Sequence, residues 1–277
     1  MDRIGLIASD MDFTLLDEHS QLPPGFEQMV LDLEGEGILF AAASGRPLYT
    51  LEKMFPTLHD HMAFIADNGG VVRWKDETIY ESRMPVEEYR AMARYCHEAG
   101  DVGVVCGMEC AYVEERYQQY DRVLRKFYTN ITYVEDLTAL DVAADKYTIY
   151  LPRDNARAAY DDQYGPGFGQ RFSVAVAGDC WVDIMNQGVN KGSALELLGR
   201  RRGLSPDGIM AFGDTYNDTE MLTTARYGFL MSNGSKDLRA RVPYLAPPHW
   251  DHGVMQVLAQ VLRQGGLVTP RDFTPAH

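Results

Sequence analysis

The chain has 277 residues, a formal net charge of −14 and 45% hydrophobic residues, a composition typical of a globular protein. A chain of this length can bury a substantial core, in one large domain or in two modest ones. Its acidic charge argues against nucleic acid and anionic membranes as partners, because both favour basic patches on a protein.

No feature of the sequence indicates a membrane span or an export signal. No apolar run approaches the ~20 residues that cross a bilayer, and the short apolar run at the start is interrupted by the charge of Asp10. Four cysteines fit neither a disulfide framework nor the paired spacing of a zinc site: Cys96, Cys106, Cys110 and Cys180. We expect buried thiols in a reducing cytoplasm, and therefore a cytoplasmic protein.

Strands and helices alternate at the start of the chain. The pattern predicts strands at 4–10, 38–43 and 62–66, with helices at about 24–36 and 47–55 between them. Such a β-α-β-α-β order implies a parallel sheet. The alternation resumes at residue 190 and continues to the end of the chain.

The pattern between these two regions is different. A small hairpin is expected over 71–84, and Pro85 begins a helix. The elements that follow are predicted as helices at 86–99 and 117–127 and strands at 102–106, 110–114, 146–151, 171–176 and 180–185. The sequence therefore predicts an α/β protein: a three-layer Rossmann-like parallel sheet core, residues 1–84 and 187–277, with an α+β domain inserted at 85–186.

Two aspartates one residue apart, Asp10 and Asp12, follow the first strand. Where a strand ends and the backbone turns, two such carboxylates can converge beyond the carboxyl end of the sheet. They repel each other unless a proton or cation lies between them. A bound Mg²⁺ would keep one carboxylate ionised as a nucleophile, while the other transfers a proton to a leaving oxygen. Taken alone, the pair also fits an acidic turn after a strand.

Two further segments carry groups that suit a phosphate. Ser44, Gly45 and Arg46 follow the second strand, where a hydroxyl and free backbone N–H groups suit a phosphate oxygen; the alternative is a turn and helix cap. Lys191 begins an amphipathic helix, an unfavourable place for a cation unless an anion is near. A solvated lysine is the alternative there.

A third apolar strand is followed by Gly213 and two aspartates four residues apart. Asp214 falls at the end of the strand and Asp218 in the first turn of the next helix. One can reach a metal ion, and the other can hold a metal-bound water or the lysine ammonium. Helix capping by the first and a favourable dipole contact by the second are the alternative.

In chain order these segments read DMDFTLL, ASGRP, NKGSAL and GDTYNDTEML, and together they resemble the haloacid dehalogenase (HAD) superfamily of phosphatases. The likeness is greatest to its Cof-type branch, subfamily IIB, which carries a large cap. Residues 231–246 are similar to the family's last core strand and helix, and 252–254 to its closing segment. The sequence departs from the family at Phe13, where glycine is usual.

The resemblance implies that Asp10 attacks phosphorus to form an aspartyl-phosphate. Asp12 would protonate the leaving alcohol and then deprotonate the attacking water, and Lys191 would neutralise the phosphoryl oxygens. The residues implied in phosphate binding are Met11, Ser44, Gly45, Arg46 and Asn217. Phosphoryl transfer needs in-line positioning and charge neutralisation, which this set provides.

The same resemblance implies a Mg²⁺ cofactor. The ion would lie between the Asp10 carboxylate, the Asp12 carbonyl oxygen and the Asp214 carboxylate, with Asp218 supporting the site. The inserted domain would be a cap that excludes water and limits the substrate to a small phosphate ester, such as a sugar phosphate or a cofactor phosphate. A monomer or a homodimer is expected.

Candidate cap contacts are Tyr112, Arg116, Trp181 and Asp183, although such residues are more often core or solvated surface. Two other functions stay open: a phosphomutase on the same scaffold, and a non-enzymatic phosphate sensor resembling a response-regulator receiver. Receivers are about half this length and lack an equivalent of Asp12. Release of inorganic phosphate from a monophosphate would distinguish the hydrolase from the mutase.

Phe13 allows two interpretations. Its ring can turn into the core and brace the turn, or it can face the cap and line the entrance of the site. We favour the second, because the next three residues, Thr14, Leu15 and Leu16, already provide apolar packing. A ring at the entrance would favour an apolar or ring-containing leaving group.

Overall fold

The computed structural model describes all 277 residues, and its largest element is a sheet of eight strands in the order β15-β14-β13-β2-β3-β4-β5-β6. The strands from β15 to β4 run parallel, and the β5–β6 hairpin adds two antiparallel strands. In sheet order the bounds are Tyr244–Ala246, Tyr227–Met231, Ile209–Gly213, Leu6–Asp10, Leu39–Ala43, Met62–Ala66, Val71–Trp74 and Glu77–Glu81.

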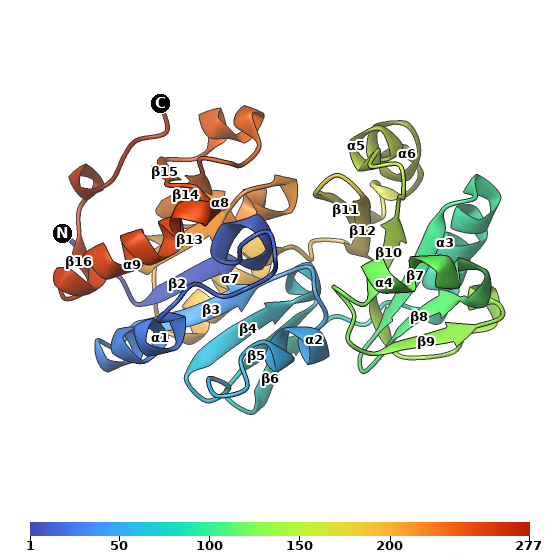
Figure 1. The fold of residues 1–277 in the computed structure, drawn as a ribbon, viewed down its shortest axis with the longest axis horizontal. Helices are drawn as coiled ribbons and strands as arrows, with labels where there is room; N and C mark the ends of the chain where they lie inside the picture. The colour runs from blue at the N-terminus through green and yellow to red at the C-terminus, as the bar shows by residue number, and fades with distance from the viewer.

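Helices cover both faces of this sheet, as the alternating pattern predicts (Figure 1). One face packs against α1 (Phe26–Gly35) and α9 (Gly253–Arg263), and the other against α7 (Lys191–Arg201) and α8 (Thr219–Thr224). Residues of one strand alternate between the two layers: in β2, Ile7 packs with the first layer, and its neighbours on either side pack with the second. The predicted three-layer α/β fold is therefore confirmed.

A second sheet has six strands in the order β11-β12-β10-β7-β8-β9 and forms a separate lobe, green to yellow in Figure 1. Its pairs are antiparallel except β8–β9. In sheet order the bounds are Phe172–Ala177, Trp181–Asn186, Ala144–Tyr150, Val102–Gly107, Ala111–Glu114 and Ile131–Val134. One face is covered by α3 (Val86–Ala99) and two short helices, α5 (Ala156–Ala159) and α6 (Gly165–Phe168).

Three local expectations differ from the structure. The helix predicted at 117–127 is a 3-10 stretch, Glu115–Tyr120, followed by the short α4, Asp121–Leu124. None of the 3-10 residues is buried, so no apolar stripe stabilises a longer α-helix there. Strand β9 was not predicted, because it is a short edge strand whose residues are mostly half-buried. Strand β10 begins two residues early, at a bulge where Asp145 has no partner on β7.

The remaining elements are minor. Helix α2 (Leu48–Lys53) follows β3, and the two-residue strands β1 (Asp2–Arg3) and β16 (Leu267–Val268) pair near the chain ends. No helix is both long enough and apolar enough to cross a membrane.

Candidate active site

Three adjacent strands of the central sheet end at one place. β2 ends at Asp10, β3 ends just before Ser44, and β13 ends just before Asp214. Because these strands are parallel neighbours, their carboxyl ends lie along one edge of the sheet, where ligands bind in open α/β folds. The structure thus brings the first, second and fourth sequence motifs together.

Lys191, from the third motif, lies inside this cluster. Its ammonium group is fully buried and lies 2.5 Å from Asp10 Oδ1 and 2.7 Å from Asp218 Oδ1. Burial alone would lower the pKa of this lysine, but the charges of Asp10 and Asp218 raise it above its usual value. The ammonium therefore stays charged, and the alternative of a solvated lysine is excluded.

The carboxyl groups of Asp10, Asp214 and Asp218 each place an oxygen within 4.8 Å of the other two. Burial, followed by the charge of Asp218, raises the pKa of Asp10 to about 7. Burial, followed by the charges of Asp10 and Asp218, raises the pKa of Asp214 well above its usual range. One ammonium cannot neutralise three carboxylates, so the cluster suits an added cation, and all-oxygen donors suit Mg²⁺.

Asp218 already uses both of its carboxylate oxygens. Oδ1 accepts from Lys191, and Oδ2 accepts from the backbone N–H groups of Asp214 at 2.9 Å and Thr215 at 3.2 Å. The side chain is 0% exposed. Asp218 therefore holds the lysine and the loop that carries Asp214, which favours a supporting role over direct contact with a metal ion.

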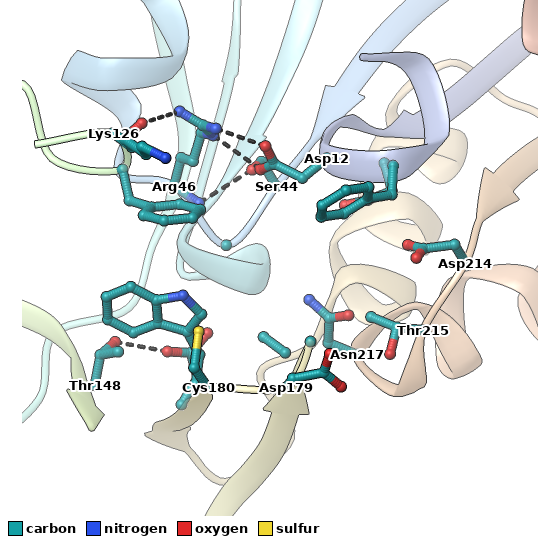
Figure 2. Close-up of a pocket in the computed structure, with 18 of the residues that line it drawn as sticks. Asp12, Ser44, Arg46, Lys126, Thr148, Asp179, Cys180, Asp214, Thr215 and Asn217 are labelled. Carbon is teal, nitrogen blue, oxygen red and sulfur yellow. Dashed lines mark hydrogen bonds and ion pairs between the residues drawn. The ribbon is translucent and has the colours of Figure 1, made fainter. Parts of the chain in front are cut away.

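Asp12 lies apart from the acidic cluster. Its carboxylate oxygens accept from Arg46 Nε at 2.9 Å and from Arg46 Nη2 at 2.6 Å (Figure 2). The sequence predicts that Asp12 converges with Asp10 and that Arg46 binds phosphate. In the structure the guanidinium group is engaged by Asp12 instead, because a two-point contact with a carboxylate matches its planar donors. Phosphate binding by Arg46 is expected from the sequence alone; with its donors engaged by Asp12 and by the Lys126 carbonyl oxygen, a role in holding Asp12 is the alternative.

Ser44 and Asn217 face the same edge of the sheet. The Ser44 hydroxyl accepts from the backbone N–H of Arg46 at 3.1 Å, a turn contact of the kind that the alternative interpretation expected. Asn217 donates to Asn68 Oδ1 at 3.0 Å, and its own side-chain oxygen is buried without a hydrogen-bond partner. Both side chains line the cavity described below.

Sequence reasoning missed a buried polar group between the two sheets. Lys146 of β10 donates to the carbonyl oxygen of Gly45 and lies 3.2 Å from Asp67 Oδ1 and 3.7 Å from Asp183 Oδ2. Asp183 also accepts from Asn68 at 2.5 Å. The sequence did indicate two of its parts, the polar Asp-Asn-Gly-Gly turn at 67–70 and Asp183, a candidate cap contact. It did not indicate Lys146, because a charged residue inside a strand such as β10 is normally assigned to the exposed face of that strand.

A cavity of about 410 Å³ lies over these groups and is lined from both sheets. Asp10, Asp12 and Asp214 form part of one wall, and Phe127 and Trp181 form part of the other. Of the four candidate cap contacts, Trp181 and Asp183 do line the cavity, as expected. The other two, Tyr112 and Arg116, do not; Arg116 is exposed, where it pairs with Glu114 and His97.

A model of the haloacid dehalogenase-like hydrolases matches residues 7–258. The chain belongs to this family. The resemblance found in the sequence is thereby confirmed, and so is the expectation of an enzyme that is a hydrolase.

Related proteins match this HAD-like hydrolase over nearly their whole length. It is 27% identical to the 5-amino-6-(5-phospho-D-ribitylamino)uracil phosphatase YbjI of Escherichia coli K12, over 94% of this chain and 97% of that one. It is also 27% identical to the HMP-PP phosphatase of Cronobacter sakazakii, over 95% of each chain. The crystal structure of SMU.1108c from Streptococcus mutans superposes with a TM-score of 0.86, at 26% identity, over 94% and 99% of the two chains.

Phe13 stands where the sequence resemblance implies a glycine. Its φ is +59°, in the left-handed region that favours glycine. The ring is 52% exposed and lines the cavity, and it makes a T-shaped contact with the His249 ring, with the ring centres 5.6 Å apart. Asn233 donates to its carbonyl oxygen at 2.9 Å and holds the turn. The ring therefore does not turn into the core, and the interpretation that it lines the entrance is correct.

We expect Phe13→Gly to change the ranking of the esters that the enzyme accepts, because it removes an apolar surface from the entrance. The free energy of unfolding should stay within about 1 kcal/mol of the parent's. Glycine adopts the left-handed backbone conformation without strain, and this gain offsets the lost ring contacts. Turnover of a panel of ring-bearing phosphate esters, with acetyl phosphate as a reference that has no ring, checks the ranking. Thermal unfolding checks the stability. An unchanged ranking would show that the ring takes no part in selection.

Proposed function

We propose that this HAD-like hydrolase is a Mg²⁺-dependent phosphatase that hydrolyses a small phosphate monoester through an aspartyl-phosphate. The observation that carries the proposal is the setting of Asp10. It ends the central strand β2 at the floor of the cavity, with the buried Lys191 ammonium at 2.5 Å and the Asp214 carboxyl group beside it. A carboxylate held in this way suits nucleophilic attack on phosphorus.

The proposed reaction has two steps. Lys191 contacts Asp10 Oδ1, while Oδ2 accepts no hydrogen bond from the protein and is free to attack. The bond from Asp10 to phosphorus forms, the bond to the leaving oxygen breaks, and Asp12 gives its proton to that oxygen. In the second step Asp12 takes a proton from water, the water oxygen bonds to phosphorus, and the bond to Asp10 breaks.

The residues proposed to hold Mg²⁺ are Asp10 and Asp214, through their carboxylates, and Asp12, through its carbonyl oxygen. When bound, the ion would supply positive charge for the phosphoryl oxygens and for the two carboxylates. Asp218 supports this group from behind by holding Lys191 and the backbone of Asp214.

Phosphate binding is proposed for groups at the ends of β2 and β3. The N–H group of Met11 follows the nucleophile, and the Ser44 hydroxyl and the Gly45 backbone begin the turn after β3. Asn217 lines the cavity beside them and completes the set. Together with Lys191 they would surround the equatorial oxygens of a transferring phosphoryl group.

The second sheet supports a cap role for residues 85–186 and a core role for 1–84 and 187–277. Aromatic rings from both parts line the cavity, Phe13 from the core and Phe127, Tyr128 and Trp181 from the cap. We infer a leaving group that carries a ring, since such walls favour flat apolar surfaces. The uracil phosphatase named among the relatives acts on a ring-bearing phosphate, which supports this choice.

The decisive experiment is an assay of inorganic phosphate release from a panel of phosphate esters with Mg²⁺. The panel should include p-nitrophenyl phosphate, sugar phosphates and ring-bearing cofactor phosphates. A phosphatase releases phosphate from a monoester without a bisphosphate activator, whereas a mutase returns the phosphoryl group to its substrate. Failure to release phosphate from any ester would contradict the proposal.

We expect Mg²⁺ to raise the Tm of the protein, because it relieves the repulsion among three carboxyl groups, of which Asp10 and Asp218 are buried and Asp214 is half-buried. Binding stabilises by RT ln(1 + [L]/Kd), about 2.7 kcal/mol when free Mg²⁺ is 100 times Kd. Thermal unfolding with and without MgCl2 measures the shift, and EDTA should reverse it. Asp214→Asn should lose most of it, while Asp60→Asn, a change of the same kind at an exposed surface position, should keep it. A parent protein with no shift would contradict the metal site.

A further inference from the structure

Arg46 fixes the orientation of the Asp12 carboxylate. Its two nitrogens reach both carboxylate oxygens, at 2.9 and 2.6 Å, and this two-point contact sets the plane of the carboxyl group as well as its position. Both side chains line the cavity, but Arg46 is only 5% exposed, whereas Asp12 keeps 29% exposure. The arginine is thus a buried support, and the carboxylate that it holds stays accessible to a substrate.

The second lobe holds Arg46 in turn. Nη1 donates to the carbonyl oxygen of Lys126 at 2.5 Å, and the guanidinium group lies over the Phe127 ring, 5.0 Å from its centre. Figure 2 shows the guanidinium group between the Asp12 carboxylate and Lys126. One side chain of the core therefore links the expected proton-transfer residue to a segment of the other lobe.

That segment, residues 126–130, also docks on helix α2, which begins two residues after Arg46. Two hydrogen bonds join Thr50 and Thr129. One connects their hydroxyl groups at 3.2 Å, and in the other the Thr129 N–H donates to the Thr50 hydroxyl at 3.0 Å. Lys53 donates to Thr129 at 3.1 Å and to the side chain of Asn130 at 3.0 Å. Polar contacts of this kind each contribute only about 0.5–1.5 kcal/mol, so the docking depends on several weak contacts together.

We propose that Arg46 is a positioning residue for Asp12, and that docking of residues 126–130 on α2 holds Arg46 in place. The proton-transfer residue is then correctly aimed only while this segment covers the site. The inference rests on the proposed function, in which Asp12 protonates the leaving oxygen.

Leaving-group dependence tests the role of Arg46. Nitrophenolate departs without a proton, whereas an alkoxide needs one. A misplaced Asp12 should therefore lower kcat/KM selectively for alkyl esters. For Arg46→Ala we expect kcat/KM to fall about 10–100-fold with glycerol 2-phosphate, on the scale of a displaced catalytic group, and less than about 3-fold with p-nitrophenyl phosphate. Equal losses on both esters would identify a phosphate ligand and overturn the proposal, as would no loss on either.

Arg46→Lys separates charge from orientation and guards against a variant that does not fold. Lysine keeps the positive charge but cannot make the planar two-point contact. We expect the same selective loss on the alkyl ester as with alanine. Recovery of parental kcat/KM on both esters by the lysine variant would show that only the charge matters and would overturn a positioning role.

Thr50→Val tests the docking, because it removes both hydrogen bonds to Thr129 and keeps the shape of a buried side chain. We expect a smaller loss, about 3–10-fold by the same scale of misplacement, again confined to the alkyl ester. The matched control is Thr57→Val, whose hydroxyl contacts Glu27 outside the docking site. Parental kinetics, or a loss shared by both esters, would overturn the link between the segment and Asp12.

Parallel assays of Asp10→Asn and Asp12→Asn separate this inference from the proposed function. Normal turnover in Asp10→Asn would contradict the phosphatase mechanism itself. If Asp10→Asn is inactive and Asp12→Asn loses kcat/KM selectively on alkyl esters, the mechanism stands. Its kcat should fall on both esters, because Asp12 also takes the proton from water in the second step that all esters share. The Arg46 and Thr50 results then decide the positioning role alone.

Discussion

Asp10→Asn is expected to abolish nearly all phosphate release while the protein still folds. The asparagine side chain keeps the shape of the aspartate, but its amide is not a nucleophile. The variant removes one of three mutually repelling carboxyl groups, and Lys191 keeps its contact with Asp218. The buried cluster therefore stays paired after the change. Initial rates with p-nitrophenyl phosphate and thermal unfolding of parent and variant measure the two effects.

Asp32→Asn provides the matched control, since this aspartate lies exposed on α1 and contacts only Gln28 among side chains. Its activity should equal that of the parent. Undiminished activity in Asp10→Asn would contradict the aspartyl-phosphate route. A variant that is both inactive and unfolded would show a structural role for Asp10, so the unfolding measurement is needed to interpret the rates.

The central sheet could be predicted because its strands are short apolar runs that alternate with amphipathic helices. Leu6, Ile7 and Ala8 are all buried, and helices cover both sides of their strand. Strands of this kind are continuous in the sequence and are easily recognised. The convergence of Asp10, Ser44 and Asp214 followed from the same topology, because parallel strands that neighbour each other end along one edge.

The contacts between the two lobes could not be predicted in the same way. The pairing of Asp12 with Arg46 depends on side-chain directions in two separate turns, and spacing in the sequence does not determine these. Lys146 sits beside a bulge in β10, where the regular alternation of a strand is broken. Its contacts with Asp67 and Asp183 join elements far apart in the chain. A single sequence shows which residue types are present, but it does not show that these residues come into contact in the folded chain.

The second large effect is expected at Lys191. Lys191→Met should lower kcat by roughly 10²–10³, the scale on which enzymes lose activity when one preorganised charge partner is removed. Methionine fills a similar volume, so the loss would reflect the missing ammonium group and not a cavity. Phosphate release under saturating substrate measures kcat, and Lys236→Met, a change at an exposed position, serves as the control.

Stability should fall in the same variant, because the ammonium is fully buried between Asp10 and Asp218. Removing one partner of a buried ion pair costs about 3–5 kcal/mol, since the remaining charge stays buried without compensation. Mg²⁺ bound at the adjoining carboxylates should restore part of this loss, because it supplies positive charge to the same cluster. Denaturant unfolding with and without MgCl2 tests both statements. A loss of kcat under threefold would show that the ammonium is structural, and Asp10 would then need another partner for the charge that develops on the phosphoryl group.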